Sequence, residues 1–221
     1  MLDDTKAIEI ISRARQKNVA AAERSCLDFE RIFDDFFGDH DFRSEQVLEL
    51  GPGQYDFARE VRRRGGVVHN IDNDPAVVEL GRYLGFDVAE ENLKRLDTES
   101  RRGRYNGLFC KFSINAFWFD EPGEVKAYVA ALDGMLCNRG WGWIAPWNGP
   151  PKQGLPQEQI ELLLRTQAAA FCGCGWAGYD LSDELAGYYG ISGRVASHAL
   201  FVKNLAVPPR VKQAATAFPA R

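Results

Sequence analysis

Two glycines and one aspartate have the spacing of a ligand-binding turn. Gly51 and Gly53 follow the apolar run 47–50, and Asp72 ends the next apolar run about 20 residues further on. Glycines let a chain turn tightly and let a ligand approach the backbone, because no Cβ stands in the way. A carboxylate at that distance can accept hydrogen bonds from the two neighbouring hydroxyls of a ribose. The spacing predicts a nucleoside site, with a plain glycine turn and an Asp72 that only begins the next turn as the alternatives.

Two classes of nucleoside cofactor use such a turn, and Asp56 separates them. A dinucleotide loop has a third small residue at the place of Asp56, where the helix packs on the strand. A carboxylate there would also repel the pyrophosphate that binds at the helix N-terminus. S-adenosylmethionine carries a positive sulfonium and no phosphate, so acidic neighbours suit it. The sequence favours S-adenosylmethionine over NAD.

The two segments also resemble the motifs of a known family. Val47–Gly53 looks like the first motif of the class I, Rossmann-like, S-adenosylmethionine-dependent methyltransferases, and His69–Pro75 looks like the second. The resemblance extends over about residues 45–204. It departs from the family at Tyr55, where a third glycine often stands.

The resemblance implies a set of cofactor-binding residues in the two motifs. These are Glu49, Gly51, Pro52, Gly53, Asp72 and Asn73. Glu49 would organise the loop or the cofactor's amino group, Asp72 would hold the ribose, and Asn73 would lie beside the adenine. The family also places a polar residue near the adenine amine after the third strand, which implies Asn92 with Leu93 beside it; a solvent-facing loop is the alternative for that stretch.

The end of the fourth strand is the predicted meeting place of methyl donor and acceptor. Lys111, Ser113 and Asn115 alternate there and would share one side if the strand persists. We predict that they lie near the methyl group; the alternative is that they only finish the strand. The Asn/Asp/Ser-Pro-Pro-type motif of amino and nucleic-acid methylases is absent, which disfavours those acceptors.

A general base is needed only for a poor nucleophile such as an alcohol. His40 is the candidate, because it lies in an N-terminal segment that could fold over the site. His69 and His198 fall within predicted strands, where structural roles are expected.

These residues require an alternating α/β framework. Helical periodicity predicts helices over 3–24 and 25–37, and the rest of the chain alternates short apolar strands with helices. Such alternation predicts a doubly wound, mostly parallel, seven-stranded sheet with helices on both faces. The expected strands are 47–50, 67–71, 86–88, 107–112, 141–147, 176–179 and 195–204. We expect an N-terminal helical segment over 1–44 that could act as a lid, a cofactor-binding domain over 45–206 and a flexible tail over 207–221.

Composition places the chain among ordinary globular proteins. The 221 residues carry a net charge of −4, which argues against a nucleic-acid partner. No apolar run is long enough to span a membrane, and the acidic first residues do not resemble a signal peptide. The five cysteines lack the spacing of a zinc site, so no metal is expected. We therefore expect a cytoplasmic protein.

Together these observations predict an S-adenosylmethionine-dependent methyltransferase for a small-molecule or glycan-type acceptor. A non-catalytic nucleoside-binding or scaffold module with the same fold is the first alternative. An NAD-dependent oxidoreductase is the second.

Overall fold

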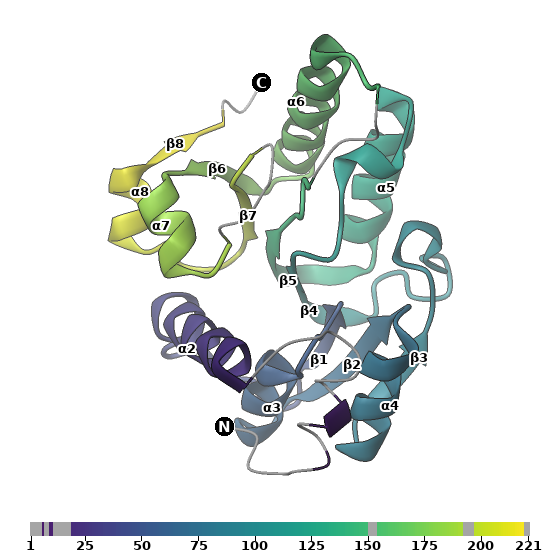
Figure 1. The fold of residues 1–221 in the computed structure, drawn as a ribbon, viewed down its shortest axis with the longest axis vertical. Helices are drawn as coiled ribbons and strands as arrows, with labels where there is room; N and C mark the ends of the chain where they lie inside the picture. Colours follow the sequence, from purple (N-terminus) through teal and green to yellow (C-terminus); the bar gives the residue numbers. More distant parts are fainter. Residues whose placement is uncertain (1–5, 7–8, 11–18, 150–153, 192–196, 219–221) are drawn as a thin grey trace.

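The computed structural model describes residues 6, 9–10, 19–149, 154–191 and 197–218. Within them, eight strands form one sheet in the order β3-β2-β1-β4-β5-β7-β6-β8 (Figure 1). Strands β1 to β5 pair in parallel, whereas β7 is antiparallel to both β5 and β6, and β8 is antiparallel to β6. The strands are β1 Gln46–Leu50, β2 Val67–Asp72, β3 Asp87–Glu90, β4 Tyr105–Lys111, β5 Leu136–Ala145, β6 Ala177–Leu181, β7 Ala199–Lys203 and β8 Ala215–Ala217.

Helices cover both faces of this sheet (Figure 1). They are α2 Val19–Phe36, α3 Asp56–Arg63, α4 Pro75–Tyr83, α5 Pro122–Gly134, α6 Gln157–Gly173, α7 Asp183–Tyr188 and α8 Pro209–Ala214, with short 3₁₀ turns η1 Leu93–Arg95 and η2 Ala116–Trp118. The predicted doubly wound α/β fold is confirmed.

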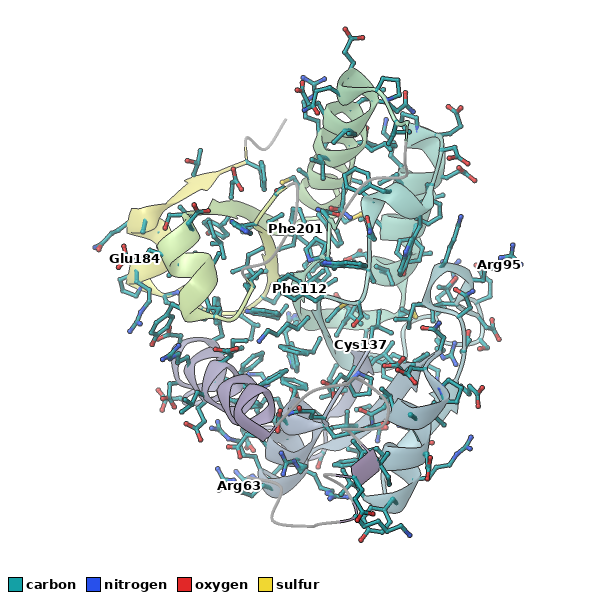
Figure 2. The ribbon with its side chains drawn as sticks, in the orientation of Figure 1. Arg63, Arg95, Phe112, Cys137, Glu184 and Phe201 are labelled. Carbon is teal, nitrogen blue, oxygen red and sulfur yellow. The ribbon has the colours of Figure 1, made fainter. Side chains whose placement is uncertain are left out.

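The strands bury apolar side chains on both faces, as parallel strands must. On one face, Phe109 of β4 and Trp143 of β5 pack with α2, α3, α4, α7 and α8. On the other face, Leu108 and Ile144 pack with α5 and α6. We call these the α2 face and the α5 face. Figure 2 shows the side chains that fill them, with Phe201 in the interior and Arg63, Arg95 and Glu184 on the outside.

Local sequence signals set the start of α4. Asp74 caps α4 by accepting a hydrogen bond from the backbone N–H of Ala76 at 3.0 Å, and Pro75 occupies the first turn of the helix. Proline fits there because its missing N–H would have no helical partner. This helix start is as predicted.

Three expectations about the ends of the chain differ from the structure. No break occurs at Ser25, since α2 is continuous from Val19; most of the predicted helix over 3–24 lies outside the described residues. The tail expected to be flexible from residue 207 instead forms α8 and β8. Strand β8 pairs with β6 and gives the sheet an eighth strand, because its backbone completes an open edge. Of this segment, 219–221 lie outside the described residues.

Among the residues described, no helix has the length and apolar character that a membrane span requires.

Candidate cofactor and acceptor site

The glycine turn follows β1 directly, at the carboxyl edge of the parallel strands. Gly51 has φ +70° and Gly53 has φ +60°, a region that favours glycine. The N–H of Gly51 donates to the carbonyl of Ile71 at 2.8 Å, which ties the turn to β2. A Cβ on Gly51 would lie 1.8 Å from Oγ of Ser113, so only glycine fits. The turn therefore brings the end of β4 against the end of β1.

Tyr55 holds the place of the third glycine without closing the turn. It keeps the left-handed conformation, with φ +63°, and its side chain is fully buried away from the turn. Its hydroxyl donates to the carbonyl of Val77 at 2.9 Å, and its ring stacks on Phe86. The backbone strain of about 1–2 kcal/mol that a non-glycine residue accepts there is offset by this buried packing.

Three carboxylates lie buried around the turn. Glu49 is 1% exposed, Asp56 8% and Asp72 5%. Burial, with the nearby negative charges of Asp56 and Asp72, raises the pKa of Glu49 well above its ordinary value. Asp56 forms an ion pair with Arg59. Oε2 of Glu49 is buried and has no hydrogen-bond partner among the described residues. The turn is thus an environment that favours positive charge.

Asp72 ends β2 and starts the turn into α4. Its Oδ1 accepts a hydrogen bond from the N–H of Asp74 at 2.9 Å, so the turn-forming role considered as an alternative is present. A carboxylate has about four acceptor positions, so a turn-forming role and hydrogen bonds from ribose hydroxyls are compatible.

The other predicted cofactor residues have mixed surroundings. Asn73 is exposed beside Asp72. Asn92 is exposed and caps η1, its Oδ1 accepting from the N–H of Lys94 at 2.9 Å. Leu93 is 5% exposed and packs on the α5 face, where its carbonyl accepts a hydrogen bond from the hydroxyl of Tyr128 at 2.7 Å. Asn92 and Leu93 thus have evident structural roles.

The residues at the end of β4 do not share one side. Lys111 lies under α2, with Nζ 3.7 Å from Oδ2 of Asp28 and 4.7 Å from the centre of the Phe29 ring. Ser113 lies against Gly51, as described. Asn115 is 7% exposed and caps η2 by accepting from the N–H of Phe117. They diverge because the strand ends at Lys111 and the chain turns at Phe112, where φ is +63°.

Asp28 and Phe29 are absent from the residues predicted for the site. They come to the end of β4 because α2 packs across the sheet, and no local spacing links a residue on that helix to Lys111. For Phe29 the signal in the sequence is the helical spacing of aromatic residues, shared with Phe33 and Phe36, which predicts burial but not the partner.

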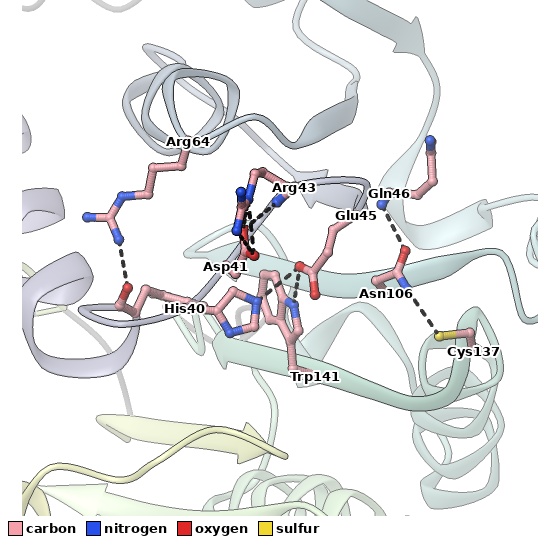
Figure 3. Close-up of polar contacts among 10 residues, drawn as sticks. His40, Asp41, Arg43, Glu45, Gln46, Arg64, Asn106, Cys137 and Trp141 are labelled. Atoms are coloured by element: carbon pink, nitrogen blue, oxygen red, sulfur yellow. Dashed lines mark hydrogen bonds and ion pairs between the residues drawn. The ribbon is translucent and has the colours of Figure 1, made fainter.

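His40 does not join the other candidates. Its Nε2 lies 3.0 Å from Oε2 of Glu45, which also accepts a hydrogen bond from Nε1 of Trp141 at 2.9 Å (Figure 3). Glu45 precedes β1, so this cluster lies at the amino edge of the sheet, opposite the glycine turn. The reason is topological: α2 ends at Phe36 and the chain enters β1 ten residues later, at Gln46. The expected catalytic role of His40 conflicts with this position.

The strand order separates this fold from dinucleotide-binding sheets. Their parallel strands follow the order 3-2-1-4-5-6. Here the antiparallel β7 is inserted between β5 and β6.

Several solved structures are similar to this chain in fold. The phosphoethanolamine N-methyltransferase 1 of Haemonchus contortus, solved with phosphoethanolamine and S-adenosylhomocysteine, matches with a TM-score of 0.57 and 10% identity over 92% of this chain. This chain covers 48% of that protein. The magnesium protoporphyrin IX methyltransferase of Synechocystis PCC 6803, with bound S-adenosylmethionine, gives 0.52 and 13% identity, covering 90% of each chain. DesVI of Streptomyces venezuelae gives 0.52 and 13% identity, over 94% of this chain and 99% of that one.

The chain has the class I methyltransferase fold. No protein-family model and no curated protein matches the sequence. In a class I methyltransferase fold, as in other open α/β sheets, ligands bind beyond the carboxyl ends of the strands at the point where strand order reverses. That point lies between β1 and β4, where Gly51 and Ser113 meet.

Proposed function

We propose that this protein is an S-adenosylmethionine-dependent methyltransferase that acts on a small-molecule or glycan-type acceptor. The observation that carries the proposal is the buried acidic group at the glycine turn, Glu49, Asp56 and Asp72. A dinucleotide would place its pyrophosphate close to these carboxylates, whereas S-adenosylmethionine brings a sulfonium and an ammonium group.

The residues present fit such a cofactor. The unpartnered Oε2 of Glu49 can accept a hydrogen bond from an ammonium group, directly or through a water molecule. The backbone at Gly51 and Gly53 has no Cβ to obstruct a ligand. Asp72 would accept hydrogen bonds from the ribose hydroxyls.

The chain's own contribution to methyl transfer is alignment. When bound, the cofactor supplies a methyl group activated by the sulfonium. The close contact between Gly51 and Ser113 would fix the donor against the end of β4. Lys111, Asp28 and Phe29 would line the acceptor side there. Holding reactants in attack geometry is worth about 7–11 kcal/mol in favourable cases.

A small acceptor is supported by the net charge of −4, which does not favour nucleic acid. Phosphoethanolamine and magnesium protoporphyrin IX, named for two of the similar structures, are also small molecules. The two proteins are 10–13% identical to this chain, which supports a shared fold but not a shared acceptor.

Calorimetric titration tests the cofactor. We expect S-adenosylhomocysteine to bind with a Kd near the micromolar range, about −8 kcal/mol. Asp72→Asn keeps an oxygen for the N–H of Asp74 but loses the charge that strengthens hydrogen bonds to ribose, so its Kd should rise about tenfold or more.

The matched control is Asp87→Asn, at the amino end of β3, which should leave the Kd unchanged. Absence of binding at millimolar ligand, or tighter binding of NAD, would overturn the proposal. Binding without methyl transfer to any of a broad set of acceptors would instead favour a non-catalytic module.

A further inference from the structure

Each of the three histidines lies beside a carboxylate, but in different places. His40 is at the amino edge, next to Glu45. His69 is also toward the amino end of its strand, with Nδ1 2.6 Å from Asp87 and Nε2 2.7 Å from Gln46. Both ring nitrogens of His69 are therefore occupied by surface contacts on the edge away from the glycine turn.

His198 lies at the opposite edge. It immediately precedes β7, which runs antiparallel to β5 with Ile144 beside Phe201. The start of β7 therefore lies beside the end of β5, on the carboxyl edge of the parallel strands. This is the edge that carries the glycine turn and the end of β4.

The side chain of His198 belongs to the α2 face. Ser197, Ala199 and Phe201 line a cavity of about 800 Å³ beside α6, on the α5 face. The backbone bond from the N–H of Leu181 to the carbonyl of His198 extends the pairing with β6 to this residue, so the alternation of the strand includes it. Residues of the other parity, such as Leu200, pack on the α2 face.

Lys111 shares that face and that edge. It has the same parity as Phe109, which packs on the α2 face, and it contacts Asp28 and Phe29 of α2. One strand, β5, separates β4 from β7. An acceptor bound beside Lys111 would therefore lie on the same face and at the same edge of the sheet as His198.

The ring of His198 is arranged as a proton acceptor. Its Nδ1 lies 3.3 Å from Oδ1 of the exposed Asp183, at the start of α7, which favours the tautomer with the proton on Nδ1. Nε2 then carries a lone pair. That atom is buried and has no hydrogen-bond partner in the part of the chain that the structure describes. In a half-buried histidine with a purely structural role, a buried ring nitrogen would ordinarily be paired.

We propose that His198, oriented by Asp183, is the general base for a hydroxyl acceptor, an alcohol or a phenol. This inference rests on the proposed methyltransferase function and adds the acceptor class and the base. The acceptor's O–H proton moves to Nε2 as the oxygen forms a bond to the methyl carbon. The carbon–sulfur bond breaks with its electron pair on sulfur, which leaves a neutral thioether, a methyl ether and an imidazolium beside Asp183.

The test measures methyl transfer from S-adenosylmethionine to catechol, glucose, dimethylamine and acetate. We expect one of the two hydroxyl compounds to be methylated. His198→Gln should lower kcat with that acceptor by about 10²–10⁴-fold, the usual contribution of a general base. The affinity for S-adenosylhomocysteine should change less than twofold. Asp183→Asn should lower kcat less, because an exposed carboxylate orients the ring only weakly.

A pH profile separates a base from a structural role. The wild-type rate should rise with pH, because a general base must be free of its proton to accept one, and His198→Gln should lose this rise. Among the described residues, the charged groups Asp183, Lys111 and Asp28 lie on this side of the edge, and none of the three is changed in that variant. The matched control, His69→Gln, removes a histidine–aspartate pair at the other edge and should keep both rate and profile.

The outcomes are distinguishable. The role of His198 would be overturned if His198→Gln kept the wild-type rate. It would also be overturned if a protein that binds S-adenosylhomocysteine methylated only dimethylamine or acetate, or none of the four compounds. Either result would leave the cofactor assignment intact. Failure of the wild-type protein to bind S-adenosylhomocysteine would overturn both proposals.

Discussion

At the scale of single residues, Glu49 is a costly group in the candidate site. A carboxyl that is 1% exposed and close to Asp56 and Asp72 is disfavoured in its charged form. Such a group is a liability for stability unless a ligand with positive charge compensates it. It therefore links cofactor binding to the stability of the free protein.

The stability of the protein should depend on pH through Glu49. Because its folded-state pKa is raised above the unfolded value, its favourable contribution is complete below about pH 4 and is lost as pH rises through the raised pKa. Glu49→Gln removes this loss, so the difference in Tm between variant and wild type should grow from pH 4 to pH 8. About 2–4 °C would correspond to 1 kcal/mol for a chain of this size.

Thermal unfolding across this pH range checks the expectation, and the same variant should bind S-adenosylhomocysteine more weakly. A difference in Tm that stays constant with pH would show that Glu49 is not the source.

At the scale of elements, Tyr55 and Gly81 fix how α4 packs beside the start of α3. The hydroxyl of Tyr55 fills the place of a side chain at Gly81, where an added Cβ would lie 2.1 Å from that oxygen. The tyrosine replaces the third glycine of the turn, and the glycine on α4 makes room for its ring. The two departures from ordinary helix and turn sequences thus compensate each other.

Gly81→Ala should destabilise the protein although it improves helix propensity. Overpacking costs about 1–3 kcal/mol, which exceeds the gain of about 1 kcal/mol from replacing glycine in a helix. In a Tyr55→Gly background the same change should be neutral or stabilising, because the ring is absent. Urea denaturation of the four proteins in this double-mutant cycle measures the coupling, and additive effects would contradict the proposed compensation.

At the scale of the whole molecule, α2 makes polar contacts with the end of α7 and with α8, which lie near the other end of the chain. The hydroxyl of Tyr189 donates to Oδ2 of Asp35 at 2.7 Å, and Arg210 pairs with the same carboxylate at 3.3 Å. Arg31 of α2 donates to the carbonyl of Tyr188 at 3.0 Å. Figure 1 shows α2 below α7 and α8 on one side of the sheet. These contacts hold Asp28 and Phe29 at the end of β4.

Tyr189→Phe should lower the free energy of unfolding by about 1.5–3 kcal/mol, the range for a hydrogen bond to a charged group. Tyr189 is fully buried, so water does not take the place of the hydroxyl that donates to Asp35 in the wild type. Tyr179→Phe on β6 is the matched control and should cost little, because the structure gives its hydroxyl no hydrogen bond to a described residue. Chemical denaturation measures both variants. An equal loss in the free energy of unfolding in the two would contradict the role of Tyr189 in holding α2.

Features that depend on neighbours along the chain can be predicted from local residue types. The apolar strand, glycine turn and helix around Gly51 follow from local residue types, as does the cap of α4 at Asp74. The position of Asp72 at the end of the next strand follows from strand periodicity. These features need only short-range sterics and hydrogen bonds, and the resemblance to methyltransferase motifs rests on them.

Which distant residues meet depends on how the whole chain packs. The insertion of β7 between β5 and β6 places His198 on the carboxyl edge, and the direct entry from α2 into β1 places His40 on the other edge. The packing of α2 brings Asp28 to Lys111, and pairing with β6 orders the segment around β8. Strand order and helix docking depend on burying both faces of the whole sheet at once, and no window of sequence contains that information.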